Sequence, residues 1–201
     1  DYNAIAISNV VAMGIDVQED MIRHMILNSI RMHRMKHKEK FGEIVICTDG
    51  GNNWRKEYFP AYKHKRKSAR KESKMDWNEL FRITNLVLDE IKANFPWKVI
   101  EVNDCEADDI IGEMVRYTQQ FGQFENVMIQ LIEDPKSLGE EVYRNYLRNK
   151  KLIDLEYTPD HIKKDIVERY NSYVVPKQNV MNYLMEKRCR MLIESVTEFV
   201  S

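Results

Sequence analysis

The sequence predicts an α/β domain with a central, mostly parallel sheet, followed by a small helical region. Up to residue 129, short apolar runs rich in β-branched residues alternate with longer segments of helical periodicity. Such alternation is typical of parallel strands that are joined by helices. From residue 130 onward only helical patterns remain. We therefore expect two domains, at residues 1–129 and 130–201.

The first half of the chain contains three elements in order. Residues 1–8 look like the end of a strand and the turn beyond it. Residues 17–42 carry the apolar spacing of an amphipathic helix, which Gly42 ends. Residues 43–48 form a short apolar run that predicts a buried strand, closed by a loop at Asp49.

The remaining elements follow from the same signals. Residues 75–95 predict a helix, because the apolar spacing is helical and Pro96 stops it. Further along we expect a strand at 97–102, a helix at 107–122, a strand at 126–129 and a helix at 158–173, with Thr158 as N-cap and Pro159 at its first position.

Composition excludes several classes of protein. The chain is 43% hydrophobic and 31% charged, as expected for a globular protein. No apolar run approaches the roughly 20 residues of a membrane span, and the first residues lack the basic start of a secretory signal. The three cysteines are odd in number and widely spaced, which favours a reducing compartment without disulfides or a zinc site.

Charge is separated along the chain although the formal net charge is only −1. Residues 54–74 are strongly basic, whereas residues 101–113 contain acids and no bases. Blocks of opposite sign carry more information about ligands than the total charge does.

Acidic residues follow three of the predicted strands. They are Asp1, Asp49 and the group Asp104, Glu106, Asp108 and Asp109. The carboxyl ends of parallel strands meet at one edge of a sheet, where ligands bind. Close carboxylates need a counter-charge, and an oxygen-only site suits Mg²⁺ or Mn²⁺. The alternative is that these acids bind no ligand and only stabilise a helix N-terminus, where the helix dipole favours negative charge.

A helical projection ranks the acids of the second group. Ala107, Ile110 and Met114 belong to one apolar stripe, with Asp108 at its edge and Asp109 nearly opposite. Glu106 precedes the first turn. We therefore expect Glu106 and Asp108 to be the better metal ligands and Asp109 the weaker one, and we assign no role to Asp104.

The basic segment alternates with aromatic residues: Trp54, Tyr58, Phe59 and Tyr62. Lys and Arg neutralise phosphates, and aromatic rings stack on unpaired bases. A solvated helix face is the alternative. An acidic metal pocket next to such a segment is suited to cutting a phosphodiester.

Several motifs together resemble the 5′-nuclease (flap endonuclease) family, and most of all its T-even-phage ribonuclease H type. They are EADD at 106–109, D-x-x-x-x-WRK-x-x-x-PAYKHKR from Asp49, DYNAxA at the start, and the segments IRHMILNSI, WNELF, LIDLEYTPDHI and ERYNSY. The resemblance implies a PIN-like fold with a helical arch, here within 54–75, over a site for two Mg²⁺ that Mn²⁺ can replace. It further implies 5′-to-3′ removal of RNA primers and 5′ flaps in lagging-strand replication.

The resemblance also implies roles for individual residues. The metal acids would be Asp1, Asp49, Glu106, Asp108 and Asp109; the basic pair acting on the scissile phosphate would be Lys63 and Arg66; the nucleic-acid contacts would be Arg55, Lys56, Tyr62, Lys65 and Arg70. The tail LIESVTEF resembles a sliding-clamp-binding segment through Leu192, Ile193 and Phe199, with ordinary packing as the alternative.

The implied partners are flapped or branched DNA, RNA–DNA hybrid, a sliding clamp and a single-strand-binding protein, with no membrane. A monomer in the cytoplasm, that of an infected host cell if the protein is phage-encoded, is expected.

The sequence departs from the family after residue 129. The family's second acidic element, S-x-D-x-D-F, and its helix–hairpin–helix turn, G-D-x-x-D-N, are both missing from the sequence. We therefore expect a segment to be missing near 129/130. The alternative function is a non-catalytic, structure-selective nucleic-acid-binding module with an incomplete metal site. An aspartyl phosphatase is disfavoured, because DYN does not supply the D-x-D that it needs.

Overall fold

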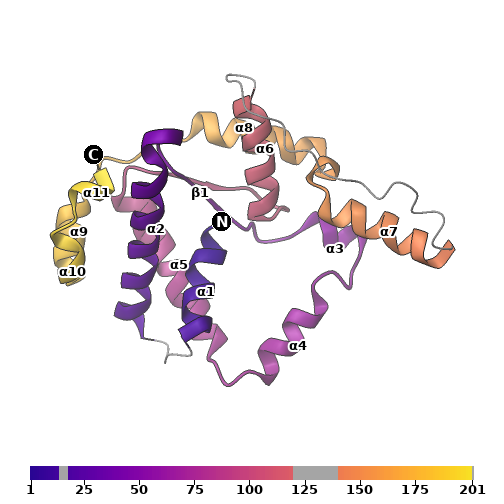
Figure 1. The fold of residues 1–201 in the computed structure, drawn as a ribbon, viewed down its shortest axis with the longest axis horizontal. Helices are drawn as coiled ribbons and strands as arrows, with labels where there is room; N and C mark the ends of the chain where they lie inside the picture. The colour runs from indigo at the N-terminus through magenta and orange to yellow at the C-terminus, as the bar shows by residue number, and fades with distance from the viewer. Residues whose placement is uncertain (14–17, 120–139, 201) are drawn as a thin grey trace. The chain divides into compact units, whose positions relative to one another are not determined.

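The computed structural model describes residues 1–13, 18–119 and 140–200, which are mostly helical with a small two-stranded parallel sheet (Figure 1). These residues form two compact units, each made of separate pieces of chain. Unit 1 comprises Asp1–Thr48, Ala61–Ile100 and Ser172–Ser201, and unit 2 comprises Asp49–Pro60 and Glu101–Asn171. The predicted domain boundary and the strand predicted at 126–129 lie outside the described residues.

Unit 1 packs helices α1 (Tyr2–Met13), α2 (Glu19–Phe41) and α5 (Trp77–Asn94) beside strands β1 (Val45–Thr48) and β2 (Lys98–Glu101). Helix α2 contacts both α1 and α5, and Figure 1 shows the three helices grouped together. The helices predicted at 17–42 and 75–95 and the strands predicted at 43–48 and 97–102 are confirmed. Gly42 ends α2 with φ 81°, and Asp76 starts α5 by accepting the N–H of Glu79 at 3.0 Å.

The prediction of a strand end at residues 1–8 is wrong, because α1 begins at Tyr2. Its alternating small and branched residues fit a strand pattern, but burial follows a helical spacing. Tyr2, Ala6 and Val10, each four residues apart, are all buried in unit 1. Packing against α2 therefore decides the conformation of a segment whose local pattern is ambiguous.

Three short helices close the core of unit 1 from the C-terminal part of the chain. They are α9 (Val180–Glu186), α10 (Arg190–Ile193) and α11 (Thr197–Val200). The Phe199 ring is fully buried and lies 5.6 Å from that of Phe95 and 6.0 Å from that of Trp97, centroid to centroid. Distant parts of the sequence therefore share one aromatic core.

A buried charge network also joins three helices of unit 1. Arg23 of α2 donates from Nε to Glu90 of α5 at 2.9 Å, and the Tyr183 hydroxyl of α9 donates to the same carboxylate at 2.7 Å. Lys187 lies 2.8 Å from its other oxygen. Burial opposes ionisation of Glu90, but these hydrogen bonds outweigh it and hold its pKa below the ordinary value.

The basic segment of unit 1 forms an exposed helix, α4 (His64–Glu72), in which no residue is buried. Five of its nine residues are Lys or Arg, and the only acid is its last residue. Packing energy therefore contributes little to this helix, and its surface is available to solvent along its length.

Unit 2 contains α3 (Trp54–Tyr58), α6 (Ala107–Gln119), α7 (Glu140–Ile153), the short 3₁₀ helix η2 (Leu155–Tyr157) and α8 (Asp160–Ser172). The helices predicted at 107–122 and 158–173 are present, although α8 begins at Asp160. Gly112 of α6 permits a close approach by η2, since a Cβ there would lie 2.7 Å from Leu155 Cδ1.

Two further expectations concern the chain as a whole. The three cysteines, Cys47, Cys105 and Cys189, are buried and unpaired. None of the described helices is both long enough and apolar enough to cross a membrane.

Candidate active site

The loop after β1 and the turn after β2 are joined by backbone hydrogen bonds in unit 2. The N–H of Gly50 donates to the Cys105 carbonyl at 3.0 Å, and the N–H of Trp54 donates to the Asp104 carbonyl at 2.8 Å. The Asp49 carboxylate accepts the N–H of Ala107, the first residue of α6, at 2.8 Å. The structure thus brings together two of the three acidic strand ends that the sequence placed at one edge.

Backbone geometry explains two residues of this junction. A Cβ at Gly50 would lie 2.1 Å from the Val102 carbonyl oxygen, so only glycine fits between the two loops. Asp104 has φ 63°, in the left-handed region that Asp and Asn tolerate better than other side chains. Asp104, which had no role in the sequence-based prediction, therefore shapes the turn through its backbone.

Glu106 precedes α6 and caps it. Its carbonyl accepts the N–H of Asp109 at 3.0 Å, and its own N–H donates to Asp109 Oδ2 at 3.0 Å. This exchange resembles half of a capping box, with Asp109 in the position of the returning carboxylate. The Glu106 side chain is 12% exposed, and one of its oxygens lies 3.7 Å from Arg55 Nη1.

Asp109 is the most deeply buried acid of the group, with 1% of its surface exposed. Arg55 contacts it with two prongs, Nη1 to Oδ2 at 2.5 Å and Nη2 to Oδ1 at 2.8 Å, and the Thr158 hydroxyl donates to Oδ1 at 2.6 Å. Burial opposes ionisation, but the hydrogen bonds from Arg55, Thr158 and the Glu106 N–H outweigh it and hold the pKa of Asp109 below its ordinary value. Asp109 is therefore a charged anchor.

The helical projection ranked Asp108 and Asp109 in the wrong order of burial. Asp108 is exposed, whereas Asp109 faces the interior of unit 2. Ala107, Ile110 and Met114 form one buried face of α6, whereas Asp109 is buried on the side of Gly112, where Leu155 packs and a buried arginine supplies the counter-charge. The predictions of metal binding at Glu106, Asp108 and Asp109 stay predictions, but Asp109 has its oxygens engaged by protein donors.

Arg55 is itself buried, with 2% of its surface exposed. Its Nε donates to the Leu152 carbonyl at 2.7 Å, and its guanidinium carbon lies 4.6 Å from the centre of the Trp54 ring. The structure thus gives Arg55, predicted to contact nucleic acid, a protein partner for each edge of its guanidinium. A bound phosphate would reach it only if the pair with Asp109 opened.

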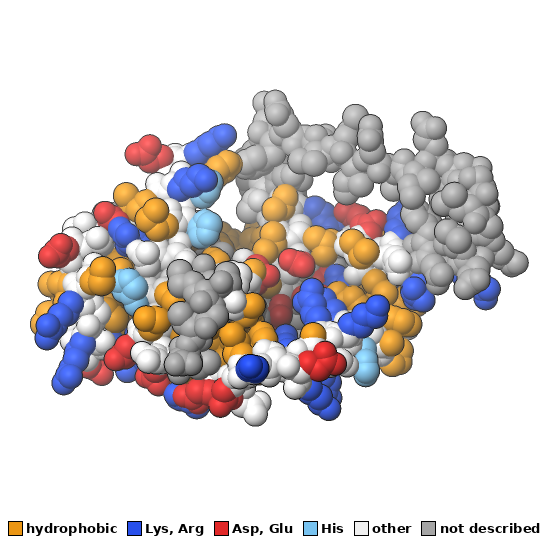
Figure 2. Space-filling model, turned by 60° about the horizontal axis from the view of Figure 1, so that its bottom comes forward, with side chains coloured by type: hydrophobic (Ala, Val, Ile, Leu, Met, Phe, Trp, Pro, Cys, Tyr) orange, Lys and Arg blue, Asp and Glu red, His pale blue; other side chains and the backbone are white. Residues whose placement is uncertain are grey.

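The other basic candidates are more accessible. Lys56 is exposed in α3 of unit 2, and in unit 1 Lys65, Arg66 and Arg70 are exposed on α4. Lys63 precedes α4 with φ 55°, and its Nζ lies 5.1 Å from the centre of the Tyr62 ring. On the face drawn in Figure 2, positive and negative side chains of the described residues are interspersed.

Arg70 differs from its neighbours on α4 because it lies over two aromatic rings. Its guanidinium carbon is 5.3 Å from the centre of the Trp77 ring and 5.0 Å from that of Phe81. These contacts tie α4 to the start of α5 within unit 1.

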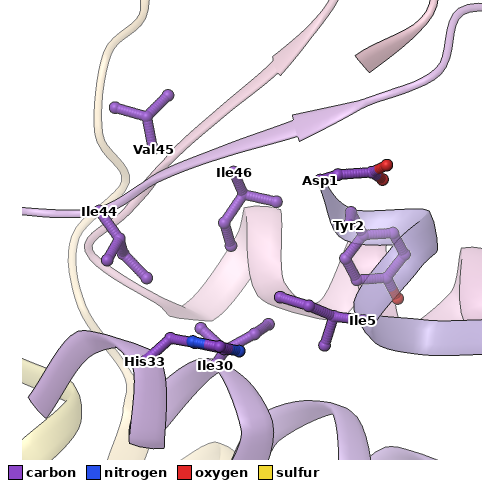
Figure 3. Close-up of a pocket in the computed structure, with 8 residues that line it drawn as sticks. All are labelled: Asp1, Tyr2, Ile5, Ile30, His33, Ile44, Val45 and Ile46. Atoms are coloured by element: carbon purple, nitrogen blue, oxygen red, sulfur yellow. The ribbon is translucent and has the colours of Figure 1, made fainter. Parts of the chain in front are cut away.

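Asp1 belongs to unit 1, where its carboxylate accepts the N–H of Ala4 at 3.0 Å and so caps α1. It also lines a cavity of about 140 Å³ between α1, α2 and the segment that enters β1. Figure 3 shows Ile5, Ile30 and Ile46 directed into this largely apolar space. Membership of Asp1 in a metal site stays a prediction.

The junction offers carboxylate oxygens, the donor type that magnesium takes. Within residues 1–13, 18–119 and 140–200, no three His, Cys, Asp or Glu side chains converge to hold a metal ion. Asp49 and Glu106 are nonetheless neighbours through Ala107, and both offer carboxylate oxygens. Magnesium commonly uses one or two protein carboxylates and completes its shell with water and substrate phosphate. The residues fit such a partial shell.

The three residues proposed to bind a clamp lie in the core of unit 1 or against it. Leu192 and Phe199 are buried, and Ile193 packs against the same cluster. The structure therefore shows the packing that was the alternative interpretation of this tail.

The sequence reasoning missed Thr158 and the Leu152 carbonyl as partners of the acidic turn. Thr158 was expected to cap α8, but its hydroxyl donates to Asp109 and α8 starts two residues later. No local signal could have found this contact, since 49 residues separate the two side chains.

Comparison with known proteins supports the resemblance that the motifs suggested. Residues 117–199 match the family described as T4 RNase H, C terminal. The ribonuclease H of Enterobacteria phage T4 is 25% identical over 287 residues, covering 99% of this chain and 94% of that protein. Both findings support the predicted similarity to the phage-type ribonucleases H of the 5′-nuclease family. This relationship supports a 5′-nuclease or ribonuclease H function.

The phage-type relative is longer than this chain within the aligned region. The alignment covers 287 positions and the chain has 201 residues, so at least 86 positions of the relative have no counterpart here. The sequence predicted a missing segment near 129/130, which lies outside the described residues, and its place stays a prediction.

Proposed function

We propose that this chain is a Mg²⁺-dependent 5′-to-3′ nuclease, of ribonuclease H and flap-endonuclease type, that hydrolyses RNA primers and 5′ flaps in lagging-strand DNA replication. The observation that carries the proposal is the similarity to a ribonuclease H over 99% of the chain. The junction of Asp49 with the acidic turn supports it, because two strand ends deliver carboxylates to one place.

In this proposal the acids and bases divide the work. Asp49, Glu106 and Asp108 hold Mg²⁺, with Asp1 as a further ligand, whereas Asp109 supports the turn. When bound, the metals activate water and take up charge on the phosphate. Lys63 and Arg66 bind the scissile phosphate, with Arg66 one turn along the start of α4 from Lys63.

Nucleic acid would be bound by the basic residues that the structure leaves exposed. Lys56, Lys65 and Arg70 neutralise the backbone, and Tyr62 stacks on a base. Such phosphate contacts make affinity fall with added salt. The substrates are flapped or branched DNA and RNA–DNA hybrid, bound by a monomer with a PIN-like core. Delivery to replication forks by a sliding clamp or a single-strand-binding protein is part of the same proposal.

The non-catalytic binding module is not favoured, because the relative that matches over almost the whole chain is named as a ribonuclease.

The test compares two Asp→Asn variants on a 5′-labelled flap and an RNA–DNA hybrid. We expect Asp49→Asn to abolish Mg²⁺-dependent cleavage. Binding of the flap in Ca²⁺ should persist, since asparagine can still accept the Ala107 N–H and so keep the turn folded. Asp165→Asn, an exposed change on α8, is the control and should cleave as the unaltered chain does. Cleavage by Asp49→Asn at the control rate would refute the assignment, and no cleavage by the unaltered chain would refute the proposed function itself.

A further inference from the structure

The end of α7 and the segment that follows it toward α8 are tied to the acidic turn by polar contacts inside unit 2. We call residues 152–158 the connector. At its first residue, the Leu152 carbonyl accepts Arg55 Nε at 2.7 Å, and at its last, the Thr158 hydroxyl donates to Asp109 at 2.6 Å. The connector is therefore attached at both ends to the two side chains of one buried ion pair.

The middle of the connector is held along α6. Arg116 of α6 donates to the Glu156 carboxylate at 2.8 Å and to the Leu155 carbonyl at 3.2 Å. The Leu155 side chain rests where Gly112 leaves room for it. The backbone of the connector is also fixed locally, because the Asp154 side chain accepts the Glu156 N–H at 3.0 Å and starts η2. The Thr158 hydroxyl is thus presented by a segment with little freedom.

Asp109 transmits this contact to the residue that starts α6. One of its oxygens accepts the Thr158 hydroxyl, and the other accepts the backbone N–H of Glu106 at 3.0 Å. Arg55 links the same two acids, since its Nη1 lies 2.5 Å from Asp109 and 3.7 Å from Glu106. A carboxylate that accepts from both sides keeps one orientation, and that orientation fixes the backbone at Glu106.

We propose that Thr158 is a positioning residue for the acidic turn and that the connector, through Thr158 and Asp109, holds Glu106 in its working orientation. The inference rests on the proposed function for what Glu106 does there, but the positioning itself does not depend on it. The C-terminal helical region is then part of the machinery that shapes the catalytic turn, in addition to any contact it makes with nucleic acid.

The inference distinguishes the hydroxyl from the bulk of the side chain. Thr158→Val keeps the shape and removes the donor, whereas Thr158→Ser keeps the donor and removes a methyl group. Thr118→Val is the matched control, because among the described residues the Thr118 hydroxyl bonds to the Met114 and Val115 carbonyls of its own helix, at an exposed position.

The experiment measures backbone amide exchange over residues 104–112 and steady-state cleavage of a 5′ flap in the full chain. For Thr158→Val we expect about 10-fold faster exchange in this segment and turnover lowered about 10-fold, as for removal of a side chain that orients a metal ligand, with KM for the flap unchanged. Thr158→Ser should restore both, and Thr118→Val should change neither.

The opposing results are equally specific. Unchanged exchange at 104–112 in Thr158→Val would overturn the inference, and so would a uniform rise in exchange across the chain, which means general destabilisation. If Thr158→Val does not fold, Arg55→Lys, which keeps the charge but loses the two-pronged contact, must raise exchange at 104–112 for the inference to stand. Absence of cleavage by the unaltered chain would refute the proposed function. The amide exchange at 104–112 would still decide whether Thr158 positions the acidic turn.

Discussion

Asp109→Asn should destabilise the protein by about 3–5 kcal/mol, the usual cost of removing one partner from a buried ion pair. The substitution keeps the shape of the side chain and one acceptor for the Thr158 hydroxyl. It leaves the Arg55 guanidinium, 2% exposed, without its carboxylate partner at 2.5 and 2.8 Å. The remaining acid, Glu106, lies 3.7 Å away and does not replace a two-pronged contact. Because small domains are stable by only about 5–15 kcal/mol, the loss should be large.

Urea unfolding followed by far-ultraviolet circular dichroism measures this change, and Asp108→Asn is the matched control. Asp108 is the adjacent residue of the same helix, and its side chain is exposed. A surface substitution of that kind usually alters stability by about 0.5 kcal/mol or less. Equal losses in the two variants would refute the reasoning, as would a loss below about 1 kcal/mol in Asp109→Asn, well under the usual cost of breaking a buried pair.

Three further predictions follow from the described contacts. Asp109 and Glu90 both have pKa values below the ordinary range in the folded protein. Their contribution to stability is therefore complete above the unfolded-state pKa values, about 4, and is lost as the pH falls through the lower folded-state values. Thermal unfolding from pH 6 to pH 2 should show stability falling below about pH 4, and a midpoint that does not change with pH would contradict the pairing. Phe199→Ala should cost about 3–5 kcal/mol in urea unfolding, because the ring is fully buried, and a change below about 1 kcal/mol would mean that α11 is not docked. Gly50→Ala should destabilise by about 1–3 kcal/mol, since its Cβ would overlap a backbone carbonyl, while Gly51→Ala, with open space around it, should be near neutral; equal effects would disprove the close approach.

Much of the secondary structure could be predicted because its signals are local. The helix 19–41 is recognisable from apolar spacing and the terminal glycine, and the helix 77–94 from apolar spacing and Pro96 after it. Residues 1–8 could not be predicted in the same way. A short run of alternating small and branched residues fits either conformation, and the choice depends on the surface against which Tyr2, Ala6 and Val10 pack.

The candidate site was predictable where the chain itself sets the geometry. Three acidic strand ends were expected to meet. The Asp49 carboxylate does reach the first turn of α6, whereas Asp1 precedes a helix and not a loop after a strand. The burial of Asp109 was not predictable, because a helical projection scores apolarity and cannot include a counter-ion 54 residues away. Once Arg55 neutralises it, a carboxylate can occupy an interior position that the projection reserves for apolar residues.

The interleaving of the two units has a consequence for synthesis on the ribosome. Unit 1 takes its pieces from both sides of the long insertion between Ile100 and Ser172, and Phe199 and Leu192 complete its core. About 70 residues must be translated across that interval, which takes several seconds at roughly 5–20 residues per second. Until then the apolar faces of α2 and α5 lack part of their cover, whereas every described piece of unit 2 has already been made. Unit 2 can therefore fold before unit 1, and part of the apolar surface of unit 1 stays exposed until the C-terminal helices have been made.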